Sequence, residues 1–137
     1  MLFRSVLAGV INALLVTGRK IEDTKFVFAG AGAGGIASAK LLMEQGATNI
    51  TLVDSVGIIS RDRTGLTAVK SAMLDTTNPD DISGGLADAM RGADVFIGLA
   101  AADTVSAQMV TSMAKDPIVF AMANPIPEIF PDVAKAA

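Results

Sequence analysis

The amino-acid sequence predicts an α/β protein with an α/β/α arrangement of layers, in which helices cover both faces of a mostly parallel sheet. Four short apolar runs are rich in β-branched and aromatic residues, as expected for strands buried on both faces. Segments with helical spacing of apolar residues separate these runs, and such alternation indicates a parallel sheet. The four runs cover residues 25–29, 49–53, 94–99 and 117–121.

The chain begins with a segment that we interpret as a buried amphipathic helix. Residues 6–17 place apolar side chains at helical intervals, and Gly18 can end the helix in a left-handed conformation. A secretory signal peptide is the alternative, because Arg4 precedes the apolar run, but no small-residue cleavage pattern follows it. The run is also shorter than the roughly 20 residues that a membrane span needs. The first strand, 25–29, should lie at the centre of the sheet.

A second helix and a second strand follow. Helical spacing resumes at Gly34 and stops at Gly46, and the strand at 49–53 then completes a βαβ unit. The next stretch, 55–83, reads as a long excursion with a helix near 67–74.

The last part of the chain supplies two more strands and the helices between them. A short helix is expected at 86–90, and a further helix, capped by Thr104 or Ser106, should run to about Ala114. The segment 124–131 contains too many prolines to continue as central sheet.

The length, charge and composition of the chain argue against several classes of function. The 137 residues suit one domain, 1–137, and 51% hydrophobic residues suffice for an ordinary core. A net charge of −3 disfavours binding to nucleic acid or to a membrane surface. The absence of cysteine and histidine removes thiolate chemistry and the commonest base and metal ligand. A cytoplasmic location is expected because nothing in the sequence calls for an oxidising compartment.

A glycine-rich turn follows the first strand and opens the second helix. Its GxGxxG pattern, in this strand-to-helix context, is typical of a Rossmann-like dinucleotide-binding domain. The first glycine makes the tight turn, the second lets a pyrophosphate approach the backbone, and the third lets the helix press on the strand. Helix amides and the helix dipole would attract the phosphates. The candidate cofactor-binding residues of this turn are Gly30, Ala31, Gly32, Ala33, Gly34 and Gly35.

Asp54 follows the second strand, near the spacing expected of a carboxylate that binds the adenosine ribose. This carboxylate favours NAD, because it would repel a 2′-phosphate. Arg61, Arg63 and Lys70 lie in the following excursion, where an arginine could accommodate that phosphate, although each is also an ordinary surface residue. The choice between NAD and NADP therefore stays open.

Four segments of the sequence carry a resemblance to a known family, and the last two are far more specific than a glycine pattern. They cover residues 7–14, 30–37, 86–98 and 113–128. On these segments, and along nearly its whole length, the sequence resembles the C-terminal NAD(P)-binding domain of the malic enzyme family.

The resemblance implies an oxidoreductase that converts malate to pyruvate and carbon dioxide with reduction of NAD or NADP. A divalent metal, Mg or Mn, is implied for the complete enzyme only. Asn124 matches a family asparagine that reaches the substrate and the nicotinamide, so it is a candidate for both cofactor and substrate binding. Ala100, after the third strand, leaves space for the ribose or nicotinamide and is a weaker candidate.

The sequence also lacks residues that the family uses for catalysis and metal binding. The chain contains no tyrosine, and the family's catalytic lysine, catalytic tyrosine and metal ligands lie mainly upstream of the matched region. We therefore assign no catalytic and no metal-binding residue, and we expect a fragment truncated at both ends, without its substrate domain and inactive alone.

Apolar surface exposed by truncation could drive formation of a homo-oligomer. A non-enzymatic dinucleotide-binding or interaction module, and the cofactor domain of another dehydrogenase, are the alternative functions.

Overall fold

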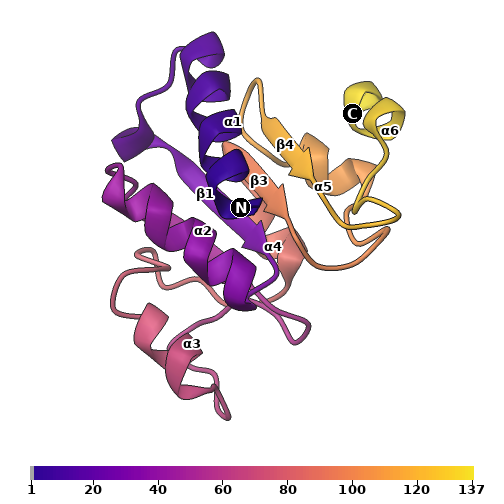
Figure 1. Cartoon of the computed structure of the whole chain (residues 1–137). Coiled ribbons are helices and arrows are strands. Elements are labelled where there is room, and N and C mark those ends of the chain that lie inside the picture. Colours follow the sequence, from indigo (N-terminus) through magenta and orange to yellow (C-terminus); the bar gives the residue numbers. More distant parts are fainter. Residues whose placement is uncertain (1) are drawn as a thin grey trace.

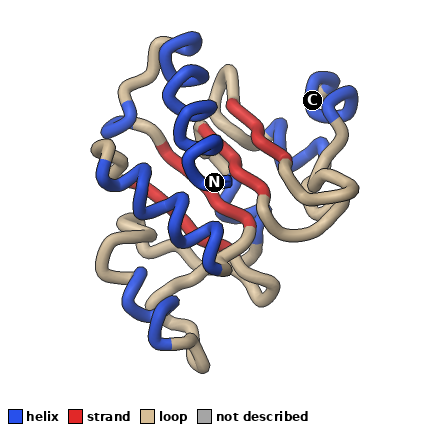
Figure 2. The backbone as a smooth tube through the Cα atoms, viewed as in Figure 1, coloured by secondary structure: helices blue, strands red, loops and turns tan. Residues whose placement is uncertain are grey.

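A computed structural model describes residues 2–137 and contains one four-stranded parallel sheet (Figures 1 and 2). The strand order is β2-β1-β3-β4, so the first strand in the sequence lies inside the sheet, as predicted. All neighbouring strands are parallel. The strands are β1 (Lys25–Ala29), β2 (Asn49–Val53), β3 (Val95–Gly98) and β4 (Ile118–Ala121). The predicted three-layer fold is confirmed.

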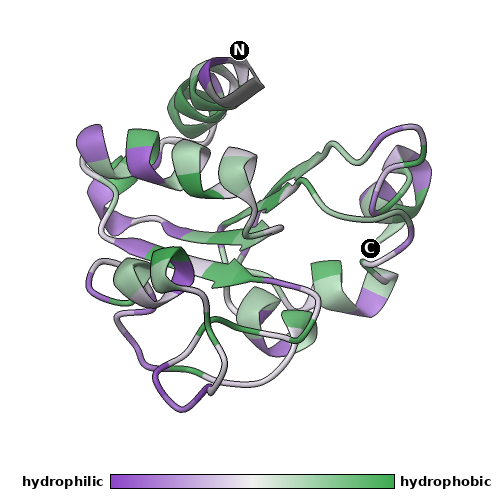
Figure 3. Ribbon diagram, turned by 60° about the horizontal axis from the view of Figure 1, so that its bottom comes forward, coloured by the Kyte–Doolittle hydropathy of each residue, from purple (hydrophilic) through white to green (hydrophobic). Residues whose placement is uncertain are grey.

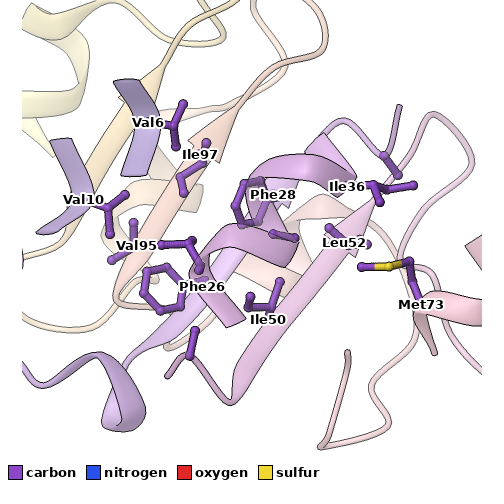
Figure 4. Packing of buried hydrophobic residues seen from close by; sticks show 14 of the residues in the cluster. Val6, Val10, Phe26, Phe28, Ile36, Ile50, Leu52, Met73, Val95 and Ile97 are labelled. Carbon is purple, nitrogen blue, oxygen red and sulfur yellow. The ribbon is translucent and has the colours of Figure 1, made fainter. Parts of the chain in front are cut away.

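Helices α1 (Leu2–Thr17) and α2 (Ala33–Glu44) cover one face of the sheet (Figure 1). Figure 4 shows Val6 and Val10 of α1 beside the side chains of β3, in the same buried cluster as Phe26 and Phe28 of β1. These valines are one helical turn apart, so one stripe of α1 packs on the sheet while the opposite stripe faces outward.

The opposite face of the sheet packs against α4 (Leu86–Met90) and α5 (Ala107–Thr111). Val27 of β1 and Phe96 of β3 belong to this second cluster, together with Met90 of α4. Successive residues of each strand therefore enter opposite clusters, as the two-residue period of a β-strand requires. This burial on both faces explains why the strands read as continuous apolar runs.

The excursion after β2 is ordered around a buried asparagine. The Asn78 side-chain amide donates to the Ile82 carbonyl oxygen at 2.8 Å, and its backbone N–H donates to the Ile50 carbonyl oxygen at 2.7 Å. Asn78 is fully buried and adopts a positive φ of 50°. The excursion, with its helix α3 (Ala68–Met73), is thereby tied to the edge strand β2.

The structure corrects the predicted end of one helix and selects one of the two predicted caps at its start. Helix α5 ends at Thr111 rather than near Ala114, because the Ala114 N–H donates to the Ala93 carbonyl oxygen and leaves the helix. Ser106, and not Thr104, caps this helix, since its hydroxyl accepts from the Met109 N–H.

The structure also contains two elements that the sequence interpretation did not include. A 3₁₀ turn, η1 (Ile21–Asp23), precedes β1, and a helix, α6 (Pro131–Ala136), follows the proline-rich segment. Pro131 occupies the first turn of α6, where proline is favourable, so this proline starts a helix rather than only ending the sheet.

The hydropathy of the chain follows this layering. In Figure 3 the strands are mainly hydrophobic and polar residues gather on the outer turns and loops. Within residues 2–137, every helix is too short or too polar to cross a bilayer.

The packing of α1 generates a first prediction, which compares two valines of the same helix. Val10 is 0% exposed and Val16 is 87% exposed. Val10→Ala should lower the free energy of unfolding by about 2 kcal/mol, because it removes two methyl groups from a packed cluster. Val16→Ala should change it by less than about 0.5 kcal/mol. Urea unfolding followed by circular dichroism measures both, and equal losses would contradict the packing described here.

Candidate functional site

The glycine-rich turn connects the end of β1 to the start of α2, as the sequence predicted. Gly30 has a φ of +118°, which only glycine adopts without strain, and its N–H donates to the Val53 carbonyl oxygen at 2.8 Å. A Cβ atom on Gly35 would lie 2.0 Å from the Gly30 carbonyl oxygen. Gly30 is therefore required by its backbone conformation, and Gly35 by the close approach of α2 to the turn.

Gly32 and Gly34 differ, because no atom within 4 Å would meet a Cβ atom there. The space beside them is open. Gly32 is the N-cap of α2, and no side chain caps this helix end. The first amides of an α-helix lack acceptors within the helix, so this turn presents N–H groups and the positive end of a helix dipole. The open backbone has the form that suits a phosphate group.

A cleft of about 600 Å³ opens beside this turn, at the carboxyl ends of β1, β2 and β3. In open parallel sheets this edge is the usual position for ligands. The walls are largely apolar, with Asp54 and Lys70 as the charged side chains. The lining residues include Gly30, Ala31, Gly32, Asp54, Lys70, Leu86, Ala100 and Thr104.

Asp54 has four donors at its carboxylate. Oδ1 accepts from the backbone N–H groups of Val56 and Gly57 and from Arg63 Nη1 at 2.8 Å. Oδ2 accepts from Lys70 Nζ at 2.8 Å. Burial acts to raise the pKa of Asp54, but the hydrogen bonds from Arg63, Lys70 and the two backbone amides outweigh it and hold the pKa well below its usual range. Asp54 is therefore a carboxylate whose charge is already compensated.

The three basic residues considered for a 2′-phosphate separate into two groups. Arg63 and Lys70 both contact Asp54, and their side chains are 18% and 26% exposed. Arg61 instead donates to the carbonyl oxygens of Asn78 and Leu74, each at 2.8 Å. Arg61 thus holds the excursion together, and it does not line the cleft.

The two remaining candidates lie after neighbouring strands. Ala100 follows β3 and lines the cleft. Asn124 follows β4, has an exposed side chain and precedes Pro125 through a cis peptide bond. Asn124 is not among the residues that line the cleft, so its role as a cofactor and substrate ligand stays a prediction.

Glu128 lies near the cleft, in contact with Ala100, and the sequence analysis did not predict a role for it. It is fully buried and connects the loops after β3 and β4, since its carboxylate accepts from the N–H groups of Ala100 and Ala123. A glutamate within a proline-rich segment would ordinarily be solvated, and only the apolar neighbours Ile126 and Ile129 hint at burial.

The features that characterise this cleft do not recur at a second hollow of the structure. A larger hollow of about 810 Å³ lies along β4 and between α5 and α6, but it is lined mainly by apolar residues and lacks the glycine turn. Across residues 2–137, no group of three or more Asp or Glu side chains converges to hold a metal ion.

A family described as "Malic enzyme, NAD binding domain" matches residues 4–133. The chain belongs to this family. The NAD-dependent malic enzyme of Geobacillus stearothermophilus is 48% identical over 130 residues, which cover 95% of this chain and 27% of that enzyme. An NADP-dependent malic enzyme of Rhizobium meliloti (strain 1021) is 47% identical over 128 residues, which cover 91% of this chain and 16% of that enzyme.

Solved malic enzyme structures share this fold. The crystal structure of an NAD-dependent malic enzyme from Thermotoga maritima superposes with a TM-score of 0.95 and 36% sequence identity. The match covers 98% of this chain and 36% of that chain. The resemblance to malic enzymes is thus confirmed, and this chain spans about a third or less of the relatives described here.

The close approach at Gly35 generates a second prediction. Gly35→Ala should cost about 2 kcal/mol of stability, because its Cβ atom would overlap a backbone oxygen that cannot easily move. Gly34→Ala is the matched control on the same helix, where the new methyl group meets open space. It should be neutral or stabilise by up to about 1 kcal/mol. Thermal unfolding of both variants checks this, and a neutral Gly35→Ala would contradict the geometry.

The compensated charge of Asp54 generates a third prediction. Its pKa is depressed in the folded state, so its ion pairs stabilise the fold above the unfolded-state pKa of about 4 and lose this effect as pH falls. At neutral pH, Asp54→Asn should therefore be less stable than the wild type by about 2 kcal/mol. The difference should shrink below about pH 4. Urea unfolding across this range measures it, with the exposed Asp75→Asn as control; a gap that widens on acidification would refute it.

Proposed function

We propose that this chain binds a nicotinamide dinucleotide in the cleft beside the glycine turn. The single observation that carries the proposal is the open backbone at Gly32 and Gly34, next to a free helix N-terminus at the carboxyl edge of a parallel sheet. The pyrophosphate lies over this backbone, because phosphate oxygens can reach the first amides of α2 there without meeting a side chain. Membership of the malic enzyme NAD-binding family supports the same ligand.

The two halves of the dinucleotide extend from the turn in opposite directions. The adenosine ribose lies toward Asp54, where Oδ2 accepts from Lys70 alone among the described residues and retains capacity to accept a further hydrogen bond. The nicotinamide half lies toward Ala100, whose small side chain leaves room, and toward Asn124. The shape of the cleft supports this direction, because its lining runs from Asp54 past the turn to Ala100.

We further propose that the site accepts both NAD and NADP. A lone carboxylate would repel a 2′-phosphate, but Asp54 is paired with both Arg63 and Lys70. The three side chains together carry one net positive charge. Lys70 lines the cleft, so its ammonium group is the donor best placed for a 2′-phosphate.

The complete protein would oxidise malate to pyruvate and carbon dioxide, as its relatives' names as malic enzymes suggest. The bound dinucleotide supplies the hydride acceptor for that reaction. Within this chain, Asn124 would donate its amide hydrogen bonds to the substrate carboxylate or hydroxyl oxygen. Catalytic acid, base and metal ligands would come from a substrate domain, so the chain by itself would bind cofactor without turnover. A cytoplasmic location and self-association stay predictions.

Calorimetric titration of the chain with NADH and with NADPH tests the proposal. We expect saturable binding of both, with dissociation constants within about tenfold of each other, because the Asp54 charge is compensated. A folded chain that binds neither ligand would refute dinucleotide binding. Binding of NADH alone would refute the proposed acceptance of NADP and leave the cleft assignment standing.

Lys70→Ala separates the two cofactors in the same titration. The affinity for NADPH should fall about tenfold, because a charge-assisted contact with the phosphate is lost. The affinity for NADH should stay equal or rise, since Oδ2 of Asp54 becomes free for the ribose hydroxyl groups. Lys40→Ala, on the exposed face of α2, is the matched control and should affect neither cofactor.

A further inference from the structure

Glu128 is a fully buried carboxylate at the edge of the sheet where the proposed cleft lies. Its Oε2 atom accepts from the Ala100 N–H at 3.2 Å, in the loop after β3. Its Oε1 atom accepts from the Ala123 N–H at 2.9 Å, in the loop after β4 and directly before Asn124. One side chain thus joins the two loops that carry the candidate nicotinamide-side residues.

The backbone around Glu128 strengthens the connection to the first of these loops. The Val105 N–H donates to the Glu128 carbonyl oxygen, and the Asp103 N–H donates to the Pro127 carbonyl oxygen, both at 3.1 Å. The loop after β3 is therefore bonded to the segment 127–128 through Ala100, Asp103 and Val105. A displacement of one loop must be followed by the other or break these hydrogen bonds.

The end of β3 is shaped to admit this carboxylate. A Cβ atom on Gly98 would lie 2.2 Å from Oε2 and 2.8 Å from Oε1 of Glu128. Any larger residue at position 98 would expel the carboxylate from its place. Glycine at the end of this strand and glutamate at position 128 therefore form a matched pair.

In the part of the chain that the structure describes, no cation pairs with the Glu128 carboxylate. The ion pairs formed within residues 2–137 do not include Glu128, in contrast to Asp54. Burying a carboxylate is costly, and two backbone N–H groups offset only part of the cost. A buried carboxylate at this position is therefore not explained by fold stability alone. Its two oxygen atoms accept hydrogen bonds from both loops, which an apolar side chain could not do.

We propose that Glu128 is a positioning residue that couples the loop after β3 to the loop after β4, so that Ala100 and Asn124 are held together around the nicotinamide half of the dinucleotide. This inference rests on the proposed function. The adenosine half instead contacts the glycine turn and Asp54, neither of which has a hydrogen bond to the Glu128 side chain. Loss of the coupling should therefore weaken the two halves unequally.

Glu128→Gln tests the coupling with little change in volume. Glutamine has one acceptor oxygen, so its NH₂ group must face one of the two backbone N–H donors and one connection is lost. The dissociation constant for NADH should rise about tenfold, as expected for loss of a charge-assisted hydrogen bond network. The dissociation constant for ADP, which lacks the nicotinamide half, should stay within about twofold.

Glu44→Gln, on the exposed end of α2, is the matched control and should leave both constants within about twofold of the wild type. Equal weakening of NADH and ADP by Glu128→Gln would overturn the inference, because it would indicate a merely structural role. An unchanged NADH affinity would also overturn it. In both cases binding by the wild type would leave the proposed function intact, whereas a wild type that binds neither ligand would overturn both.

Hydrogen exchange of the wild-type chain gives a second test that does not depend on how the variant folds. NADH should slow exchange of the Ala100 and Ala123 amides together, and ADP should affect both much less. Protection of only one of these amides by NADH would contradict the coupling.

Discussion

The close approach of α2 to the end of β1 is the constraint on which the rest of the site depends. Gly35 lies so near the Gly30 carbonyl oxygen that no side chain fits between them. Gly30 in turn bonds to Val53 at the end of β2 and lies against the backbone of Leu99 after β3. One turn thereby fixes the ends of three strands relative to a helix N-terminus, and the cleft is the space that remains among them.

Two buried or nearly buried carboxylates at this edge are stabilised in different ways. Asp54 is held by two backbone amides and by two long cationic side chains, which are partly exposed and can exchange one partner for another. Within residues 2–137, the side chain of Glu128 is held by backbone amides alone, which cannot move without moving the loops that carry them. The first arrangement adapts to the charge of a ligand, and the second transmits the position of one loop to another.

Most of the fold could be predicted from the sequence, because the strands are apolar runs and the helices have apolar residues at regular helical spacing. The glycine turn and Asp54 follow from local pattern and from spacing along one βαβ unit. The contacts of Arg63 and Lys70 with Asp54 could not be predicted in this way. Both residues lie on an excursion whose path depends on the buried Asn78. The end of α5 could not be predicted for a similar reason. The Ala114 N–H donates to the Ala93 carbonyl oxygen instead of continuing the helix. Contacts between distant segments leave no periodic signal in the sequence.

The position of β1 inside the sheet also has a consequence for how the chain reaches its structure. Phe26 of β1 pairs with Ile50 of β2 on one side and with Val95 of β3 on the other. The pairing of β1 with β2 closes a loop that contains only α2. The pairing of β1 with β3 closes a longer loop, which also contains β2, the excursion and α4. Distant pairings lose more chain entropy before they gain contacts. We therefore expect the unit from β1 to β2 to form first, and the joining of β3 to limit the rate at which the finished sheet, and with it the cleft, is assembled.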